Sequence, residues 1–233
     1  MSDIVVITGG AGEIGRALAE RYLADGAEVH LVDVAEHVDE VALELGATAW
    51  RIDLSDHAQI ARLGGLARVD VLVNGVGYWP PTPFDVLEPA EFTRYLDINL
   101  TSSYAVTWTL RDALRAAGGA VVTLSSAIGM KGHPDMVHYA AAKAGVLGMT
   151  KSLALALGPS GVRVNAVAPG LVSTVRNRSV WSQEQQDAFR ATRALPVDIE
   201  IADVVDAARF LASPAARVIT GQTLVVDGGT VLH

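Results

Sequence analysis

The segment VVITGGAGEIGRALAE, residues 5–20, decides the fold of this chain. An apolar, β-branched run leads into a turn with four glycines in seven residues, and a stretch of helical period follows. This order suits a dinucleotide site, because unpaired N–H groups at a helix start face the pyrophosphate and glycine lets the phosphates approach the backbone. The segment therefore predicts a nucleotide-binding turn.

The glycines of this turn can be placed in two frames. Gly10, Gly12 and Gly15 spell G-x-G-x-x-G, the dinucleotide fingerprint. A frame that starts at Thr8 instead reads T-G-x-x-x-G-x-G, with Glu13 in place of the middle glycine. The two frames assign different roles to the same residues, and the rest of the chain decides between them.

Asp33 is the acidic residue expected after such a turn. It ends the predicted strand 28–32, 18 residues after Gly15. A carboxylate there accepts hydrogen bonds from both ribose hydroxyls and repels a 2′-phosphate. The next residues, VAEH at 34–37, contain no lysine or arginine that would bind that phosphate. The sequence therefore predicts NAD rather than NADP.

Short β-branched runs alternate with segments of helical period along the whole chain. The predicted strands are 4–7, 28–32, 48–52, 69–74, 120–124, 162–167 and 223–226, and the predicted helices are 14–24, 36–45, 57–66, 89–98, 102–117, 140–157, 184–194 and 201–212. Strands that read as continuous apolar runs are typical of parallel sheets buried on both faces. We predict a single Rossmann-type domain over residues 1–233, with a doubly wound parallel α/β sheet of about seven strands and helices on both faces.

Composition narrows the classes of partner and compartment. The chain has a net charge of −8 and no cysteine, which argues against nucleic acid or anionic membrane and excludes disulfides and thiolate metal sites. No apolar run reaches the roughly 18 residues of a membrane span, and the first strand at Ile4 leaves no room for a signal peptide. We expect a cytoplasmic protein without a catalytic metal, with His133 and His138 as loop and pocket-rim residues.

Tyr139 and Lys143 suggest acid–base chemistry. Their spacing of four residues places them on one face of the predicted helix. An ammonium beside a phenol favours the phenolate and lowers its pKa, so that tyrosine can exchange the proton of an alcohol. Ser126 lies 13 residues before Tyr139, in the loop after the predicted strand 120–124, where its hydroxyl can hold the substrate oxygen.

These motifs together resemble the short-chain dehydrogenase/reductase family, in its single-domain form, from Ile4 to Gly229. The segments that carry the resemblance occur in the family's order: TGGAGEIG, VLVNGVG, YLDINL, LSS with YAAAK, RVNAVAPGLVST and ITGQTLVVDGG. The family's order favours the frame that starts at Thr8. The resemblance implies an NAD-dependent oxidoreductase that interconverts a secondary alcohol and a ketone by hydride transfer, working as a homotetramer through helices 102–117 and 140–157.

The resemblance also implies roles for individual residues. Tyr139 would be the acid/base, Ser126 would polarise the carbonyl, and Lys143 would lower the pKa of the tyrosine and bind the nicotinamide ribose. Asn99 would hold a water that links Lys143 to solvent. The cofactor would be bound by Gly9, Gly12, Ile14, Gly15, Asp33, Asp53, Leu54, Asn74, Tyr139, Lys143, Val172 and Thr174.

The substrate is expected to be of moderate size, with an apolar or ring substituent. Ser126, Trp79 and Met130 are the predicted substrate contacts, and residues 173–198 are the predicted substrate lid. Two alternatives stay open: an NADPH-linked 3-oxoacyl thioester reductase, and a nucleotide-sensing protein without catalysis. For Glu13 we expect a backbone N–H that faces the pyrophosphate and a carboxylate that faces solvent near the positive end of the helix.

Overall fold

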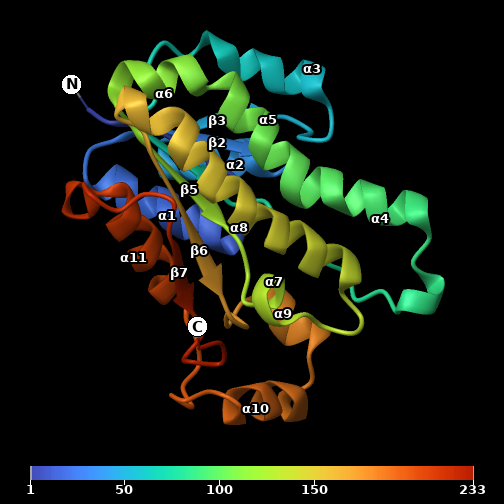
Figure 1. The fold of residues 1–233 in the computed structure, drawn as a ribbon. Coiled ribbons are helices and arrows are strands. Elements are labelled where there is room, and N and C mark those ends of the chain that lie inside the picture. Colours follow the sequence, from blue (N-terminus) through green and yellow to red (C-terminus); the bar gives the residue numbers. More distant parts are fainter. Residues whose placement is uncertain (1, 233) are drawn as a thin grey trace.

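A computed structural model describes residues 2–232 and shows a seven-stranded parallel sheet with helices on both faces (Figure 1). The strand order is β3-β2-β1-β4-β5-β6-β7, which confirms the predicted fold class. The strands are β1 Ile4–Thr8, β2 Glu28–Asp33, β3 Thr48–Arg51, β4 Val71–Asn74, β5 Ala120–Leu124, β6 Arg163–Pro169 and β7 Thr223–Val226. The order reverses between β1 and β4, so a crevice opens there at the carboxyl ends of the strands.

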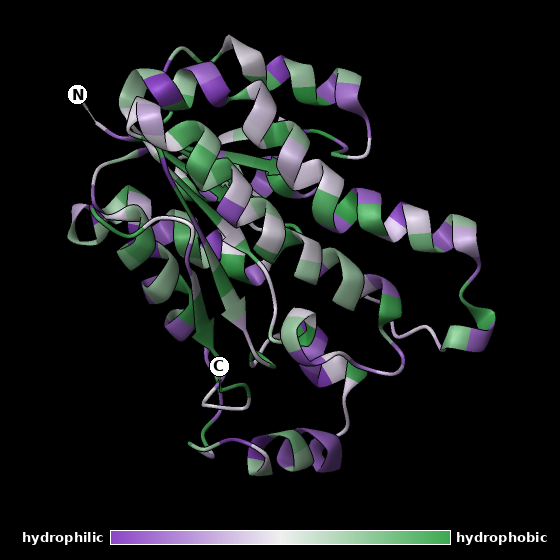
Figure 2. Ribbon diagram, viewed as in Figure 1, coloured by the Kyte–Doolittle hydropathy of each residue, from purple (hydrophilic) through white to green (hydrophobic). Residues whose placement is uncertain are grey.

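Apolar side chains fill a layer on each face of the sheet. On β1, Val5 and Ile7 belong to one cluster and Val6 to the other, because successive side chains of a strand point to opposite faces. Figure 2 shows the apolar strands enclosed by helices of mixed hydropathy. The first cluster includes residues of α1 Glu13–Ala24, α2 Val38–Leu45 and α11 Ile201–Ala212, and the second those of α3 His57–Ile60, α5 Ser102–Thr109, α6 Arg111–Ala117 and α8 Val137–Leu157.

Three predicted helices change their helix type or direction in the structure. The segment 102–117 changes direction at Leu110, whose ψ of 3° separates α5 from α6. The segment 57–66 forms α3 and then the 3₁₀ turn Ala61–Gly65, where two glycines disfavour a longer helix. The helix α4, Pro89–Leu96, continues into the π-turn Asp97–Thr101, which carries Asn99. Further 3₁₀ turns occupy Phe84–Val86, Gly158–Ser160 and Pro214–Ala216.

Short helices surround the carboxyl edge of the sheet. The α7 helix, Ile128–Lys131, and the α9 helix, Val175–Val180, are too short to show a helical period in the sequence. The predicted lid segment contains α9 and then α10, Gln183–Ala191, which begins with a capping box between Ser182 and Gln185. Figure 1 shows α9 beside α7 and α10 at the outer end of the molecule.

The helix α8 bears on the expectation that no apolar run is long enough to span a membrane. Within residues 2–232, the window Val137–Ser160 is long and apolar enough to cross a membrane by length and composition alone. In the structure α8 packs against β6, α4 and α7, and it buries Tyr139 and Lys143. The apolar residues on the packed face of α8 belong to the interior. Exposed apolar residues such as Leu155 add to the mean hydropathy of the helix.

Candidate active site

A cleft of about 900 Å³ lies at the carboxyl edge of the sheet. Asp33 and Asp53 line one end, and Ser126 and Tyr139 line the other. Residues of the predicted lid segment, including Arg176, complete the wall. The tertiary structure therefore brings most of the predicted nucleotide and catalytic residues to one cleft, whereas Asn74 and Asn99 lie outside its lining.

The glycine turn is shaped for a close approach of phosphate to the backbone. Gly9 has a φ of +70°, and the N–H groups of Gly9 and Gly10 donate to the carbonyl of Val32 at 2.9 and 3.2 Å. A Cβ on Gly15 would lie 2.2 Å from the Gly9 oxygen, so no side chain fits there. A Cβ on Gly10 would instead contact Leu31 at 2.8 Å, away from the cleft. The turn thus follows the frame that starts at Thr8, and its free helix-start N–H groups suit a pyrophosphate.

Glu13 reaches across the cleft instead of facing solvent alone. Its side chain is exposed, yet both carboxylate oxygens accept the backbone N–H of Val175, at 2.9 and 3.1 Å. Val175 is the first residue of α9, where helix N–H groups lack internal partners and a carboxylate stabilises the helix start. The expectation of a carboxylate free in solvent is corrected by this contact.

Asp33 is held rigidly at the end of β2. One carboxylate oxygen accepts the N–H of Ala11 and the other accepts the N–H of Ala35, both at 3.0 Å. Arg16, the nearby cation of the first helix, is occupied by Glu20 and Glu44. This end of the cleft therefore presents a fixed negative charge.

Asp53 and Leu54 line the cleft as predicted, and Asn74 does not. The Asn74 side chain is buried and its Nδ2 donates to Thr107 Oγ1 at 3.1 Å and Thr123 Oγ1 at 3.4 Å. Since it is directed to α5 and β5, it links elements of the scaffold. Gly75, Val76 and Gly77 take its expected place in the cleft wall.

Tyr139, Lys143 and Ser126 meet at the opposite end of the cleft. The Lys143 Nζ lies 5.5 Å from the centre of the Tyr139 ring and donates to the carbonyls of Leu124 at 2.8 Å and Val76 at 3.1 Å. The Ser126 hydroxyl accepts the N–H of Ile128 at 3.2 Å.

The backbone of Gly77 lies close to this cluster. A Cβ at Gly77 would be 3.8 Å from the Tyr139 hydroxyl and 4.0 Å from the Lys143 Nζ, which is ordinary van der Waals contact.

Burial sets the protonation of this pair. Burial raises the pKa of Tyr139 to about 12, while the Ser126 hydroxyl and then the Arg176 guanidinium lower it. Burial lowers the pKa of Lys143 to about 7. The expected lowering of the tyrosine pKa by Lys143 is therefore not found in the protein alone, because removal from water outweighs nearby charge.

Asn99 is fully buried in the π-turn and fixes the loop after β4. Its Oδ1 accepts the N–H of Tyr78 at 2.8 Å, and its Nδ2 donates to the carbonyls of Tyr78 at 2.8 Å and Tyr95 at 2.9 Å. The loop held in this way carries Trp79. The water expected at Asn99 stays a prediction.

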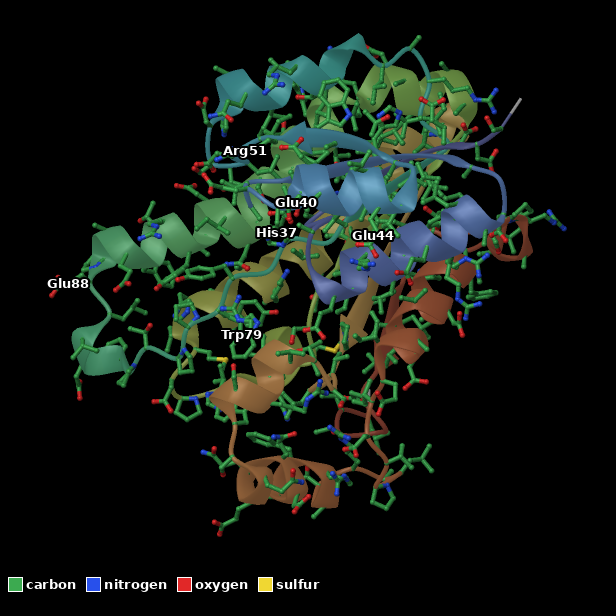
Figure 3. The ribbon with its side chains drawn as sticks, turned by 180° about the vertical axis from the view of Figure 1, so that it is seen from behind. His37, Glu40, Glu44, Arg51, Trp79 and Glu88 are labelled. Atoms are coloured by element: carbon green, nitrogen blue, oxygen red, sulfur yellow. The ribbon has the colours of Figure 1, made fainter. Side chains whose placement is uncertain are left out.

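Trp79 and Met130 have different positions relative to the cleft. The Trp79 ring lines the cleft, with its centre 6.4 Å from that of Tyr139, and lies beside α9 in Figure 3. Met130 is not among the lining residues, because the single turn of α7 directs Ile128 and Lys131 to the cleft. The predicted contact of Met130 with the substrate stays a prediction.

The predicted lid segment contacts the active-site loop through aromatic rings. Trp181 pairs with His133 at 5.8 Å and with Phe189 at 5.2 Å between ring centres. Val172 and Thr174 line the cleft as expected, and the Thr174 hydroxyl caps α9 by accepting the N–H of Asn177 at 3.1 Å.

The two histidines singled out in the sequence take different places. His133 lines the cleft, whereas His138 is fully buried, stacks on Tyr95 at 4.2 Å and lies outside the cleft wall. The expectation of a pocket-rim His138 is therefore wrong, since the residue points into the packing between α8 and α4. Over residues 2–232, no group of three potential ligands is arranged for a metal ion.

Sequence reasoning named no role for several wall residues. Arg94 directly precedes the YLDINL segment and Arg193 lies within the predicted lid segment 173–198, but nothing in either pattern shows that the side chain enters the cleft. Arg176 lies in the predicted lid segment 173–198 and also lines the cleft. Its two-residue distance from Thr174 is the signal that relates it to the cleft.

Comparison with known proteins agrees with this geometry. A family model described as enoyl-(acyl carrier protein) reductase matches residues 9–231. An uncharacterized short-chain type dehydrogenase/reductase of Sinorhizobium fredii is 38% identical over 97% of the chain, which spans 43% of that relative's length. The cis-4-hydroxycyclohexanecarboxylate dehydrogenase of Sinomonas cyclohexanicum is also 38% identical, over 97% of this chain and 95% of its own.

A solved structure shows the same architecture. The 3-ketoacyl-(acyl-carrier-protein) reductase of Brucella melitensis, complexed with NADH, superposes with a TM-score of 0.89 and 30% identity over 99% of this chain and 98% of its own. The likeness in sequence and fold extends over nearly the whole length. The chain therefore belongs to the short-chain dehydrogenase/reductase family.

Proposed function

We propose that the protein is an NAD-dependent dehydrogenase that interconverts a secondary alcohol and a ketone. The observation that carries this proposal is the meeting of Ser126, Tyr139 and Lys143 at one end of a cleft whose other end holds Asp33. A hydroxyl, a phenol and an amine at one point suit the exchange of an alcohol proton. The family's chemistry supports the same reaction.

The side chains would divide the work as follows. Bound NAD supplies the hydride acceptor, and reduced NAD the donor. In oxidation, the Ser126 hydroxyl holds the substrate oxygen while Tyr139 takes its proton and the hydrogen on carbon leaves as hydride. Lys143, with its pKa lowered to about 7, can exchange a proton near neutral pH. The tyrosine pKa of about 12 must fall for this step, and the positive charge of oxidised nicotinamide would act in that direction.

The preference for NAD rests on the charge at the ribose end. The Asp33 carboxylate is fixed there by two backbone N–H groups, and Arg16 is held by Glu20 and Glu44. A 2′-phosphate would meet negative charge without a free cation from Arg16. The NADH complex of the Brucella melitensis relative supports a nicotinamide cofactor.

A ring-bearing alcohol is the proposed kind of substrate. Trp79 and Trp181 contribute aromatic surface to the substrate end of the cleft, as is usual for small-molecule sites. The Sinomonas cyclohexanicum relative is named for a hydroxycyclohexane substrate. The segment 173–198 would close over the bound substrate as a lid.

One experiment separates this proposal from its alternatives. Turnover of a panel of secondary alcohols with NAD, followed by NADH absorbance, is the expected result. NADH binding without turnover, together with no effect of Tyr139→Phe, would favour a nucleotide sensor. Far tighter binding of NADPH than of NADH would favour the 3-oxoacyl thioester reductase, the activity named for the Brucella melitensis relative.

We also propose a cytoplasmic homotetramer. Large apolar side chains on α5 and α8 are exposed in the single chain, among them Tyr104, Trp108 and Leu155. Such surfaces favour association between copies. Light scattering coupled to size-exclusion chromatography would contradict this assembly if only a monomer eluted.

A further inference from the structure

The cleft carries opposite charges at its two ends. Its acidic lining residues, Glu13, Asp33 and Asp53, belong to the nucleotide end. In the part of the chain between residues 2 and 232, the lining at the substrate end is basic, with Arg94, Lys131, Lys143, Arg176 and Arg193. A protein with a net charge of −8 has concentrated positive charge at that place, and charge of one sign in a cleft attracts ligands of the other sign.

Among these cations, Arg176 is held in place by neighbouring side chains and keeps its guanidinium N–H groups available for an anion. Its guanidinium carbon lies 5.3 Å from the centre of the Tyr78 ring and 5.1 Å from that of Trp79. Stacking on two rings restricts the side chain and leaves the guanidinium N–H donors at its edge available. Across residues 2–232, Arg176 takes part in no ion pair, unlike Arg190, which is bound to Asp187 and Asp198.

The other cations of the cleft are less suited to this role. Lys143 and Arg193 donate to backbone carbonyls. Lys131 has a single ammonium without the planar fork of arginine. Arg94 stands on α4 without the two aromatic contacts that fix Arg176. The guanidinium of Arg176 is therefore the best candidate to bind an anion in a defined orientation.

The aromatic ring of Trp79 connects Arg176 with the reacting group. Trp79 lies 6.4 Å from Tyr139 between ring centres, and Arg176 stacks on the same indole. A substrate whose alcohol meets Tyr139 and whose body follows Trp79 would bring its far end to the guanidinium. A carboxylate at that end matches the guanidinium geometry and forms a bidentate, charge-assisted pair.

We propose that the substrate is a hydroxy acid or its oxo-acid product, with a ring-sized skeleton between the reacting carbon and a carboxylate, and that Arg176 binds this carboxylate. This inference rests on the proposed dehydrogenase function. It adds the chemical class of the substrate and the residue that selects it.

The test compares an acid with its neutral analogues on matched variants. The probes are 4-hydroxycyclohexanecarboxylate, its methyl ester and cyclohexanol as substrates, and cyclohexanecarboxylate and cyclohexanecarboxamide as ligands of the NADH-loaded protein. The variants are Arg176→Met and Arg176→Lys. Arg178→Met is the control, because Arg178 lies on the same helix, donates to Ser173 and does not line the cleft.

The expected result is a selective loss. Arg176→Met should weaken the binding of cyclohexanecarboxylate and lower kcat/KM for the hydroxy acid by about 10- to 100-fold, the effect of one lost charged hydrogen bond. Binding of the carboxamide should change by less than about twofold. Turnover of the ester and of cyclohexanol should fall much less than turnover of the acid, because the loss of the Arg176 charge raises the pKa of Tyr139 equally for all three alcohols. Arg176→Lys should restore part of the loss, and Arg178→Met should behave as the wild type.

Two outcomes would overturn the inference and leave the proposed function standing. In one, wild type handles the acid and its neutral analogues equally well while NADH binds and alcohols turn over. In the other, Arg176→Met weakens NADH as strongly as the acid, which would assign the arginine to the cofactor. Failure of the proposed function looks different, because the protein would then bind NADH without oxidising any alcohol. Selective binding of cyclohexanecarboxylate through Arg176 would still support the anion site in that case.

Discussion

The carboxylate of Glu13 accepts the backbone N–H of Val175, 162 residues later in the chain, with oxygen–nitrogen distances of 2.9 and 3.1 Å. This contact joins the glycine turn to the first residue of α9. It spans the part of the cleft where a pyrophosphate would lie beside the start of α1. Glu13 therefore restrains the predicted lid segment from the cofactor side.

Removal of this restraint should loosen the segment 173–198. We expect Glu13→Ala to increase the rate of limited proteolysis within 173–198, because α9 loses the acceptor at its first turn. Glu13→Gln keeps an acceptor oxygen, so its cleavage rate should lie between those of the wild type and of Glu13→Ala. Glu20→Ala, on the exposed face of the same helix, is the control. Equal cleavage rates in all four proteins would show that the contact does not restrain the segment.

The effect of Glu13 on the cofactor is a separate prediction. Glu13→Gly is expected to leave NAD binding within about tenfold, or about 1.4 kcal/mol, because the backbone N–H groups of the turn remain. A titration with NADH, followed by its fluorescence, measures the affinity of the variant for the cofactor. A larger change in either direction would show that the carboxylate acts on the pyrophosphate directly.

Tyr139→Phe should abolish turnover while the cofactor still binds. The substitution removes the hydroxyl that exchanges the alcohol proton, and general acid–base catalysis of this kind contributes about 10²- to 10⁴-fold. The phenyl ring keeps the packing against Trp79. NADH fluorescence and single-turnover absorbance on the same sample separate the two properties. Substantial residual activity would assign the proton transfer to another group.

The charge of Asp33 should decide between NAD and NADP. Asp33→Asn keeps an acceptor for one of the two backbone N–H groups and removes the negative charge that opposes a 2′-phosphate. We expect the ratio of NADP to NAD affinity to rise by about tenfold or more. Glu40→Gln, an exposed charge on α2 seven residues away, should leave the ratio unchanged. The same rise of this ratio in both variants would show that the overall negative charge of the surface, and not the Asp33 carboxylate itself, opposes NADP.

Lys143 should make stability depend on pH in a definite direction. Its pKa is about 7 in the native protein and about 10.4 in an unfolded chain. Between these values the unfolded chain binds more protons at this residue, so its contribution to the free energy of unfolding rises with pH. The raised pKa of Tyr139 acts in the opposite direction only above about pH 10.

The measurement is urea unfolding of the cofactor-free protein at several pH values. The free energy of unfolding of wild type minus that of Lys143→Met should increase from pH 7 to about pH 9.5. Groups that titrate alike in both proteins cancel in this difference. Lys151→Met, an exposed lysine on the same helix, should give a flat difference. If the difference between wild type and Lys143→Met did not change with pH, burial would not lower the pKa of Lys143.

Gly15→Ala tests the close packing of the glycine turn. The added Cβ would meet the Gly9 oxygen at 2.2 Å, so the turn must open, and we expect lower stability together with weaker NADH binding. Gly148→Ala is the matched control within α8, since its Cβ meets no atom within 4 Å. That variant should be neutral or up to about 1 kcal/mol more stable, because alanine favours helix. Thermal unfolding and NADH titration compare the two.

The order of strands and helices was readable because it depends on local patterns. Continuous apolar runs such as VVIT predicted strands covered on both faces, and the structure places Val6 and Ile7 in separate cores. Helix breaks were harder to predict. Leu110 has the apolar character that a continuous helix would also need, and nothing local reveals its turn.

The site residues were likewise predictable only where their placement depends on local spacing. Tyr139 and Lys143 share one helix, and their spacing alone brought them to one face. His138 was placed wrongly and Met130 lies outside the cleft lining, because the direction of each side chain depends on where a short helix or a helix start docks. The Asn74 side chain does not line the cleft, because a residue at a strand end can face either layer, and hydrogen bonds to Thr107 and Thr123 decide its direction.

The sequence by itself determined the class of sheet, the glycine turn with its following acid, and the spacing of the catalytic pair, since each depends on residues close together in the chain. Only the tertiary structure decided how Glu13 meets Val175 and how Arg176 stacks on Trp79, because those contacts join segments about a hundred residues or more apart. It also decided the protonation of Tyr139 and Lys143. Their pKa values follow from removal from water, and burial is a property of the folded chain and not of a motif.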